Sequence, residues 1–264
     1  MFDAGASLPT MVGMSLENIS TPPGLFGGAE KRAPAARLGV LVVHDLVAGI
    51  VTGSVPAGQL LPPEGELAEH FGVSRTVIRE SVKRLEEKGM VTVLQGRGTE
   101  VTPSTEWNIL DKVVISTMIE HDQTLGILDE IAVVRSELES AMSAAVASKR
   151  TDSDIEALRA ALDVMRGAID DPDRFLKVDQ DFHALVMDIS GNELAKSIAR
   201  ILVQRASDNF RFHGAAGPDA FQLTLDEHGR ILQALVDGDS NGAAVAMRDH
   251  ISQSWERRKL PRDA

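Results

Sequence analysis

The feature that most constrains this chain is a closely spaced series of helix and strand signals between residues 38 and 101. Gly72 and Val73 separate a short helical segment from a longer one, Ser74 is a natural N-cap for the longer segment, and Gly89 ends it. Two short strands then flank a glycine-rich tip, which suits a hairpin. The predicted helices are 38–52, 64–71 and 74–88, and the predicted strands are 90–94 and 99–101. This order predicts a winged helix-turn-helix, a small α+β domain.

The amino-terminal end of the segment 74–88 carries the residue types that read DNA. In a helix-turn-helix, residues at that end of the second helix reach the base edges. Arg75 and Arg79 are four residues apart and share one helix face, so each can bind a guanine with two hydrogen bonds or hold a phosphate. Gly96 at the hairpin tip lets the backbone approach DNA closely. The predicted DNA-contacting residues are Ser74, Arg75, Thr76, Arg79 and Gly96.

The charge of the whole chain points away from DNA. The formal net charge is −12, which by itself argues against a nucleic acid partner. Between Ser74 and Arg97, however, there are six basic residues against three acidic ones, and the acidity lies mostly in the carboxy-terminal two-thirds. A basic tip on an acidic body would limit non-specific DNA binding. A solvated helix face with mixed charges is the alternative interpretation of the same residues.

The stretch LPPEGELAEHFGVSRTVIRESVKRLEEKGMV resembles the amino-terminal domain of the GntR superfamily of bacterial regulators. The likeness includes the V-S-R-T-x-x-R-E core and the G-x-G of the wing. It departs from the pattern at Gly65, where many relatives carry a basic residue, so we expect a different operator preference. The resemblance implies a transcription regulator, and we expect a repressor. Because one recognition helix reads only a few base pairs, we also expect a homodimer on a pseudo-palindromic double-stranded DNA operator.

After Pro103 the pattern is helical to the end of the chain. Start signals at Thr151 and Asp171 and stop signals at Gly191 and Gly238 separate helices joined by short links, which predicts an antiparallel, all-α bundle. The predicted helices are 107–120, 126–149, 152–169, 172–190, 192–213, 219–237 and 239–258. The expected division is a flexible extension (1–36), the winged domain (37–103), a linker with a first helix (104–125), a helical domain (126–258) and a tail (259–264). The fold class is therefore mostly α.

Four polar residues fall on or beside the apolar stripes of these helices. Asp179 and His183 are spaced i, i+4, His228 interrupts an apolar series, and His250 follows Met247 by three residues. A lone histidine on such a stripe is usually a core residue with a hydrogen-bond partner, and one Asp–His pair is a weak signal. Together the four groups would be costly to bury without partners, and a divalent cation would compensate them. The chain has no cysteine, so only His, Asp and Glu are available as metal ligands.

The segment 126–250 resembles the helical effector domain of the FadR branch of GntR regulators, the FCD type. The residues that carry this likeness are Arg135, Leu138, Glu139, Asp179, His183, Asn192, Glu227, His228 and His250. The resemblance implies that Asp179, His183, His228 and His250 coordinate a divalent ion whose open positions face the effector. Three neutral imidazoles and one carboxylate suit Zn²⁺, the ion that we expect, and also Ni²⁺ or Mn²⁺.

A small carboxylate is the expected effector of this domain. Arg135 is the cation that we expect to grip it, and a structural salt bridge from Arg135 to Glu139 at i+4 is an equal alternative. Further effector-binding candidates are Arg205, Asn209 and Arg211. The stretch 107–111 resembles FadR-branch regulators of sugar-acid catabolism, which implies a hexonate or uronate. The plainer role for Trp107 is to pack the linker between the domains.

Other classes of protein are limited by what the chain lacks. It has no apolar run of about 18 residues, and its first residues lack the basic and apolar regions of a secretory signal. The absence of cysteine fits a reducing compartment, so we expect a cytoplasmic protein without a membrane partner. Two alternatives stay open. One is a metal-dependent enzyme fused to a DNA-binding domain, because such a site can activate water. The other is a DNA-architectural protein with a purely structural bundle.

Overall fold

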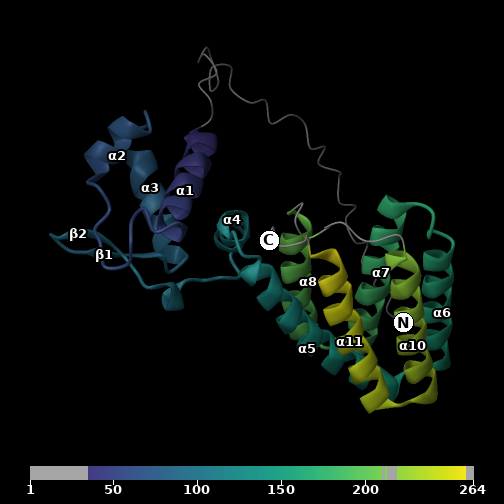
Figure 1. The fold of residues 1–264 in the computed structure, drawn as a ribbon. Coiled ribbons are helices and arrows are strands. Elements are labelled where there is room, and N and C mark those ends of the chain that lie inside the picture. Colours follow the sequence, from purple (N-terminus) through teal and green to yellow (C-terminus); the bar gives the residue numbers. More distant parts are fainter. Residues whose placement is uncertain (1–34, 210–211, 213–218, 260–264) are drawn as a thin grey trace, which may run out of the picture.

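The computed structural model describes residues 35–209, 212 and 219–259. A group of three helices with a small sheet comes first, and helices make up nearly all that follows (Figure 1). The elements are α1 (Ala35–Val51), α2 (Glu64–His70), α3 (Arg75–Glu87), β1 (Val91–Leu94), β2 (Gly98–Val101), a 3-10 turn η1 (Ser104–Glu106), α4 (Lys112–His121), α5 (Gly126–Lys149), α6 (Asp152–Arg166), α7 (Pro172–Ser190), α8 (Glu193–Ser207), α10 (Ala220–Asp237) and α11 (Ser240–Arg258). The predicted fold class is confirmed. The expected extension lies almost wholly outside the described residues, as do residues 260–264 of the expected tail.

The amino-terminal helices form the predicted helix-turn-helix. Gly72 has a φ of 62°, in the left-handed region that glycine adopts without strain, and it turns the chain between α2 and α3. The Ser74 hydroxyl accepts a hydrogen bond from the backbone N–H of Val77 at 3.3 Å and so caps α3. Ile78 and Leu85 of α3 are fully buried in one core with residues of α1. Packing of the buried face of α3 against α1 therefore fixes the orientation of its exposed face.

Gly89 ends the helix and brings the linker close. Its φ is 70°, and a Cβ placed on it would lie 2.3 Å from the carbonyl oxygen of Glu106. That separation is far inside van der Waals contact, so no residue with a side chain fits without moving the backbone of η1.

The wing is an antiparallel pair, β1 and β2, with Val91 opposite Val101 and Leu94 opposite Gly98. Gly96 at its tip has a φ of 75° and is exposed. The segment before α2 adds to the sheet, because Leu61 donates a backbone hydrogen bond to Thr99. The wing is thus tied to the helices on one side and open at its tip.

The linker differs from the predicted helix 107–120, because α4 starts only at Lys112. Trp107 has an extended backbone, and its indole N–H donates to the carbonyl of Thr102 at 3.2 Å. The Asp111 side chain accepts from the backbone of Val113 and Val114 and forms an ion pair with Lys88 at 2.6 Å. Residues 104–111 therefore follow the surface of the winged domain, and Asp111 sets the true helix start.

The side chains of α4 divide between two cores. Val114 is buried in the core of the winged domain, and Met118 packs against that core. Ile115 and Ile119 are buried in a different core, which contains Leu128 of α5 and other residues of the bundle. The single helix α4 therefore contributes to both halves of the described chain.

The remaining helices form the predicted antiparallel bundle around a core of α6, α7, α10 and α11 side chains, to which α5 also contributes. Most ends agree with the sequence signals: Asp171 caps α7 and Gly191 ends it with a φ of 64°. The helix predicted at 192–213 is shorter, because α8 ends at Ser207, where Asp208 is its C-cap. Among the described helices, none combines the length and apolar character needed to span a membrane.

Candidate functional site

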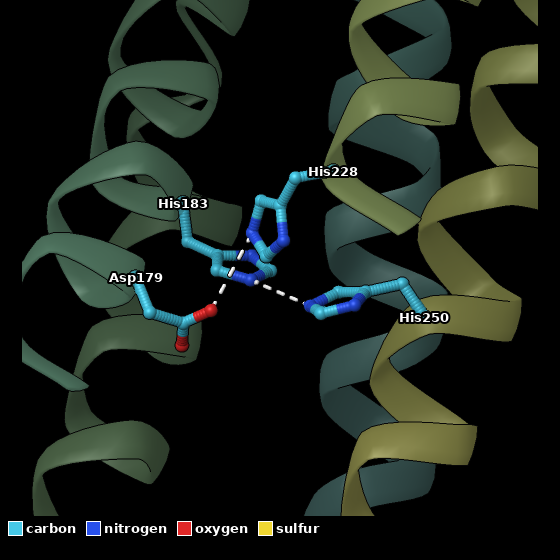
Figure 2. Close-up of side chains that lie close together, drawn as sticks. All are labelled: Asp179, His183, His228 and His250. Carbon is cyan, nitrogen blue, oxygen red and sulfur yellow. Dashed lines mark hydrogen bonds and ion pairs between the residues drawn. The ribbon is translucent and has the colours of Figure 1, made fainter. Parts of the chain in front are cut away.

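Four side chains from three helices meet inside the bundle. Asp179 and His183 lie on α7, His228 on α10 and His250 on α11 (Figure 2). All four are buried, and one ligand atom from each lies within 4.8 Å of the others. The structure thus brings together the whole set that the sequence analysis named.

Two of the imidazoles are held by buried carboxylates. The Nδ1 of His183 lies 2.7 Å from the Glu139 carboxylate, and the Nδ1 of His250 lies 2.8 Å from the Glu227 carboxylate. A carboxylate only accepts hydrogen bonds, so each Nδ1 carries the proton and donates. In the neutral form of each ring, the lone pair is then on Nε2.

The third imidazole, that of His228, also carries a proton on Nδ1. His228 donates from Nδ1 to the backbone carbonyl of Thr224 at 2.8 Å. Its Nε2 and the Asp179 Oδ1 are buried without hydrogen-bond partners and lie 3.5 Å apart. The Nε2 atoms of His183 and His250 face each other at 3.0 Å. Three ring nitrogens and a carboxylate oxygen therefore converge, and this donor set fits a divalent metal ion.

The electrostatics of the cluster favour neutral imidazoles at His228 and His250. Burial lowers the pKa of His228 to about 4, against the attraction of Asp179, and burial also holds the pKa of His250 well below its ordinary value. Burial alone would raise the pKa of Glu139, but the charge of Arg135 and the hydrogen bonds from His183 and Arg135 outweigh it and lower that pKa to about 2. Neutral imidazole is the form that binds metals.

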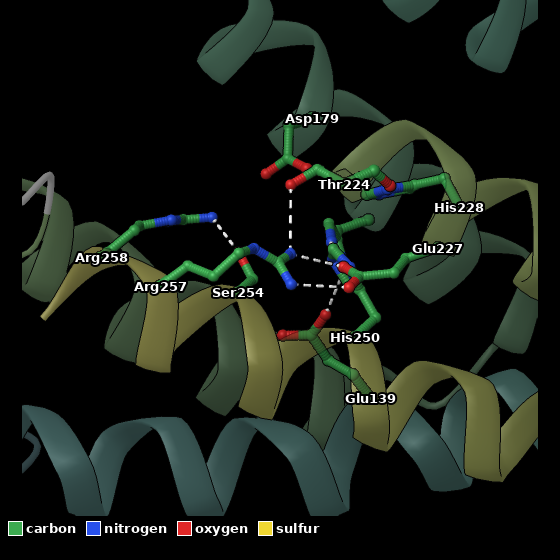
Figure 3. A network of polar contacts seen from close by, with 10 residues as sticks. Glu139, Asp179, Thr224, Glu227, His228, His250, Ser254, Arg257 and Arg258 are labelled. Carbon is green, nitrogen blue, oxygen red and sulfur yellow. Dashed lines mark hydrogen bonds and ion pairs between the residues drawn. The ribbon is translucent and has the colours of Figure 1, made fainter. Parts of the chain in front are cut away.

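Each supporting carboxylate is held by an arginine. Arg135 donates from Nε to Glu139 at 3.0 Å. Arg257 donates two hydrogen bonds of 2.7 Å to the two oxygens of Glu227 (Figure 3). The i+4 salt bridge that was the alternative role for Arg135 is thus present. The sequence analysis did not predict a role for Arg257, because its contact with Glu227 depends on how α10 and α11 pack. For the hydrogen bond from His228 to the carbonyl of Thr224, the only signal in the sequence is that Thr224 lies four residues before His228.

A cavity of about 490 Å³ adjoins the cluster. Asp179, His183 and His250 lie in its wall, and so do Arg135 and Arg258. Its volume is in the range of small-molecule sites. A ligand in this cavity would reach the cluster and two guanidinium groups.

Of the other effector candidates, the two that lie within the described residues, Arg205 and Asn209, do not line this cavity. Arg205 pairs with Asp208 at 2.9 Å, and its Nε is buried without a hydrogen-bond partner. Asn209 follows α8 and is not among the lining residues. Arg211 lies outside the described residues. The roles predicted for these three residues remain predictions.

Four of the five predicted DNA-contacting residues lie together on the surface. Ser74, Arg75, Thr76 and Arg79 are exposed at the amino-terminal end of α3. Arg79 pairs with Glu64 of α2 at 2.7 Å. The Arg75 guanidinium passes over Gly65, where a Cβ would lie 3.3 Å from Nη2. The space that a side chain at position 65 would occupy is therefore partly filled by Arg75, and Gly96 lies separately, at the tip of the wing.

A winged helix-turn-helix with exposed arginines, joined to a helical bundle with a polar cavity, is the architecture of a DNA-binding transcription regulator. Residues 39–101 match the model of bacterial regulatory proteins of the gntR family, and residues 130–253 match the model of the FCD domain. The chain belongs to the GntR family and carries an FCD domain.

Similar curated proteins include repressors and regulators of bacterial operons. The galactonate operon transcriptional repressor of Escherichia coli (strain K12) is 30% identical over 83% of this chain and 95% of its own length. The Uxu operon regulator of Haemophilus influenzae is 28% identical over 81% of this chain and 78% of its own. The repressor NanR of Cronobacter sakazakii is 27% identical over 88% and 91%. These relatives are transcription regulators, so the alternative of a metal-dependent enzyme is set aside.

Among solved structures, the regulator Lar, described for Listeria monocytogenes, has a TM-score of 0.50 and 17% identity, over 84% of this chain and 96% of that one. At this identity the likeness concerns the fold alone.

Proposed function

We propose that this regulator is a repressor whose operator affinity falls when a sugar acid or related carboxylate binds beside a divalent metal ion in the bundle. The observation that carries the proposal is the convergence of the three imidazole Nε2 atoms and the Asp179 carboxylate beside the 490 Å³ cavity. The names of the relatives support the chemical class, because one represses a galactonate operon. An anion would be attracted to a site where a metal ion and two arginines meet.

The metal ion would be held by Asp179, His183, His228 and His250, with Zn²⁺ as our choice and Ni²⁺ or Mn²⁺ as alternatives. When bound, the ion would supply a Lewis-acidic position for an effector oxygen. Glu139 and Glu227 would fix the orientation of two of the ligand rings, which raises metal affinity.

DNA binding would use α3 and the wing of two copies of the chain on a pseudo-palindrome in the cytoplasm. The proposed division is a winged domain over 37–103, a linker with α4 over 104–125 and an effector domain over 126–258. Ser74, Arg75, Thr76 and Arg79 would enter the major groove, and Gly96 would approach the backbone or minor groove.

Replacing the arginines of α3 should weaken operator binding. Arg75→Ala and Arg79→Ala are each expected to lose about 1–3 kcal/mol of binding free energy if the lost contact is bidentate to a guanine. Fluorescence anisotropy with a labelled operator measures the change, and Arg166→Ala, an exposed arginine in the bundle, is the control. Unchanged operator affinity in both variants would remove α3 from the interface.

Removing the metal should reduce the response to effector more than it affects DNA binding itself. An effector changes operator affinity only as far as its binding differs between the two arrangements of the protein, and a coupling of about 1–3 kcal/mol is ordinary. In native protein, D-galactonate or D-glucuronate is expected to weaken operator binding roughly 5- to 150-fold. Chelated protein and the Asp179→Ala variant should keep effector-free affinity and lose most of this response.

Anisotropy across an effector titration compares the three samples. The same midpoint and amplitude in native, chelated and Asp179→Ala protein would mean that the metal has no part in effector binding. An absence of any response in native protein to both acids would contradict the proposed effector class.

A further inference from the structure

The two consecutive arginines at the end of α11 have different surroundings. Arg257 donates to both oxygens of Glu227, so its charge is compensated. Arg258 donates a hydrogen bond from Nη2 to the Ser254 hydroxyl at 2.6 Å (Figure 3). It has no carboxylate partner at ion-pair distance among residues 35–209, 212 and 219–259. Most of its five N–H donors are therefore available to another molecule.

Arg258 is nevertheless held in a defined position. Its guanidinium carbon lies 5.4 Å from the centre of the Phe212 ring, and Phe212 stacks on Trp255. Ser254, its hydrogen-bond partner, is 5% exposed. A guanidinium group that is packed on an aromatic ring and tied to a buried hydroxyl has already lost much of its side-chain freedom, which favours ligand binding.

The place where Arg258 is held is the wall of the cavity beside the cluster. It lines the 490 Å³ cavity together with Asp179, and it also lines a smaller one of about 190 Å³ between α7 and α10. Burial lowers the pKa of Arg258, and the charges of Arg135 and Arg257 act in the same direction, against the attraction of Asp179. An arginine stays protonated, so its buried charge is best compensated by an anion in the cavity.

Arg135 is less available than Arg258 to bind an anion in the cavity. Its Nε already binds Glu139, and the other oxygen of that carboxylate accepts from His183. Moving Arg135 onto a ligand would loosen a metal-binding ring. Moving Arg258 would disturb its bond to Ser254 and its packing on Phe212, and neither residue is a candidate metal ligand.

We infer that Arg258 binds the carboxylate of the effector and is the residue that selects acids over uncharged sugars. This inference rests on the proposed function, since it assumes that the effector enters this cavity. Amide and hydroxyl groups of Gln180, Gln204 and Ser207 line the same cavity, so the matching ligand is a carboxylate with several hydroxyl groups. Arg135 then acts as a positioning residue for Glu139.

The test uses full-length, Zn²⁺-loaded protein and isothermal titration calorimetry with three probes: D-galactonate, D-glucuronate and the uncharged galactitol. The variants are Arg258→Gln, Arg258→Lys, and Arg248→Gln as the matched control on the same helix, where Arg248 pairs with exposed Glu137 away from the cavity. Elemental analysis and thermal unfolding of each variant show whether metal content and fold are kept.

In Arg258→Gln, the Kd of the acid that binds best is expected to rise roughly 10- to 100-fold, because charge-assisted hydrogen bonds are lost. Arg258→Lys should lose less, Arg248→Gln should bind as wild type, and galactitol should bind weakly and equally to all. If Arg258→Gln binds the acids as tightly as wild type, the inference is wrong and the proposed function stands. If neither acid binds the wild-type protein, the proposed effector class is wrong, and the inference falls with it.

Discussion

Protein in which His228 and His250 are both replaced by Ala is expected to hold no divalent metal after purification, whereas the wild type should hold about one ion per chain. Three of the four candidate ligand atoms are nitrogens, and the two replacements leave only Asp179 and His183 on one helix. Two adjacent ligands do not complete a tetrahedral site. Elemental analysis of dialysed protein measures the loss.

The control for this experiment is His44→Ala with His121→Ala, which removes two exposed histidines. The variant bundle should still fold, because Phe175, Phe182 and Leu235 form an apolar core that needs no ion. A thousandfold excess of Zn²⁺ over its Kd should stabilise the wild type and the control by about 4 kcal/mol and leave the double variant unchanged. Full metal occupancy in the His228/His250 variant would contradict the assignment of the site.

Gly89→Ala is expected to destabilise the winged domain by about 2–4 kcal/mol. The new Cβ would lie 2.3 Å from the Glu106 carbonyl oxygen, a backbone atom, and the φ of 70° disfavours any L side chain. Either α3 or η1 must move. Urea unfolding in a Trp255→Phe background, where Trp107 is the only tryptophan, measures the winged domain and its linker.

Two other glycines of the same domain separate the causes. Gly72 has a φ of 62° and open space around its Cβ position, so Gly72→Ala should cost about 1–2 kcal/mol from the backbone alone. Gly49 lies within α1 with open space and no positive φ, and Gly49→Ala should stabilise by about 0.5–1 kcal/mol. If Gly89→Ala lowered the free energy of unfolding no more than Gly72→Ala does, the close approach to Glu106 would add nothing to the destabilisation.

Local signals predicted most of the fold. Asp171, Pro172 and Gly191 fix α7 through capping and backbone geometry, both of which depend on neighbouring residues only. The start of α4 at Lys112 was misplaced, because the predicted helix began at Trp107. Its indole is instead bound to Thr102, a tertiary contact, although the capping role of Asp111 was open to local reasoning.

The site was predictable in part for the same reason. The four candidate ligands came from spacing and family resemblance, and the structure places them together. The pairing of Arg257 with Glu227 and the position of Arg258 in the cavity wall depend on the packing of α11 against α10. Arg257 and Arg258 are neighbours in the sequence. No local pattern therefore shows that Glu227 compensates the charge of Arg257 and that Arg258 faces the cavity.

The division of α4 between two cores has a consequence for the length of this helix. Val114 and Ile115 point about 100° apart around the helix axis, and each must keep its own direction. One inserted residue within α4 would turn everything after it by that same angle and take Ile119 out of the bundle core. The number of residues from Asp111 to Ile119 therefore sets the angle about the helix axis between the side chains that enter the two cores. A conventional flexible tether tolerates insertions, but this connection does not.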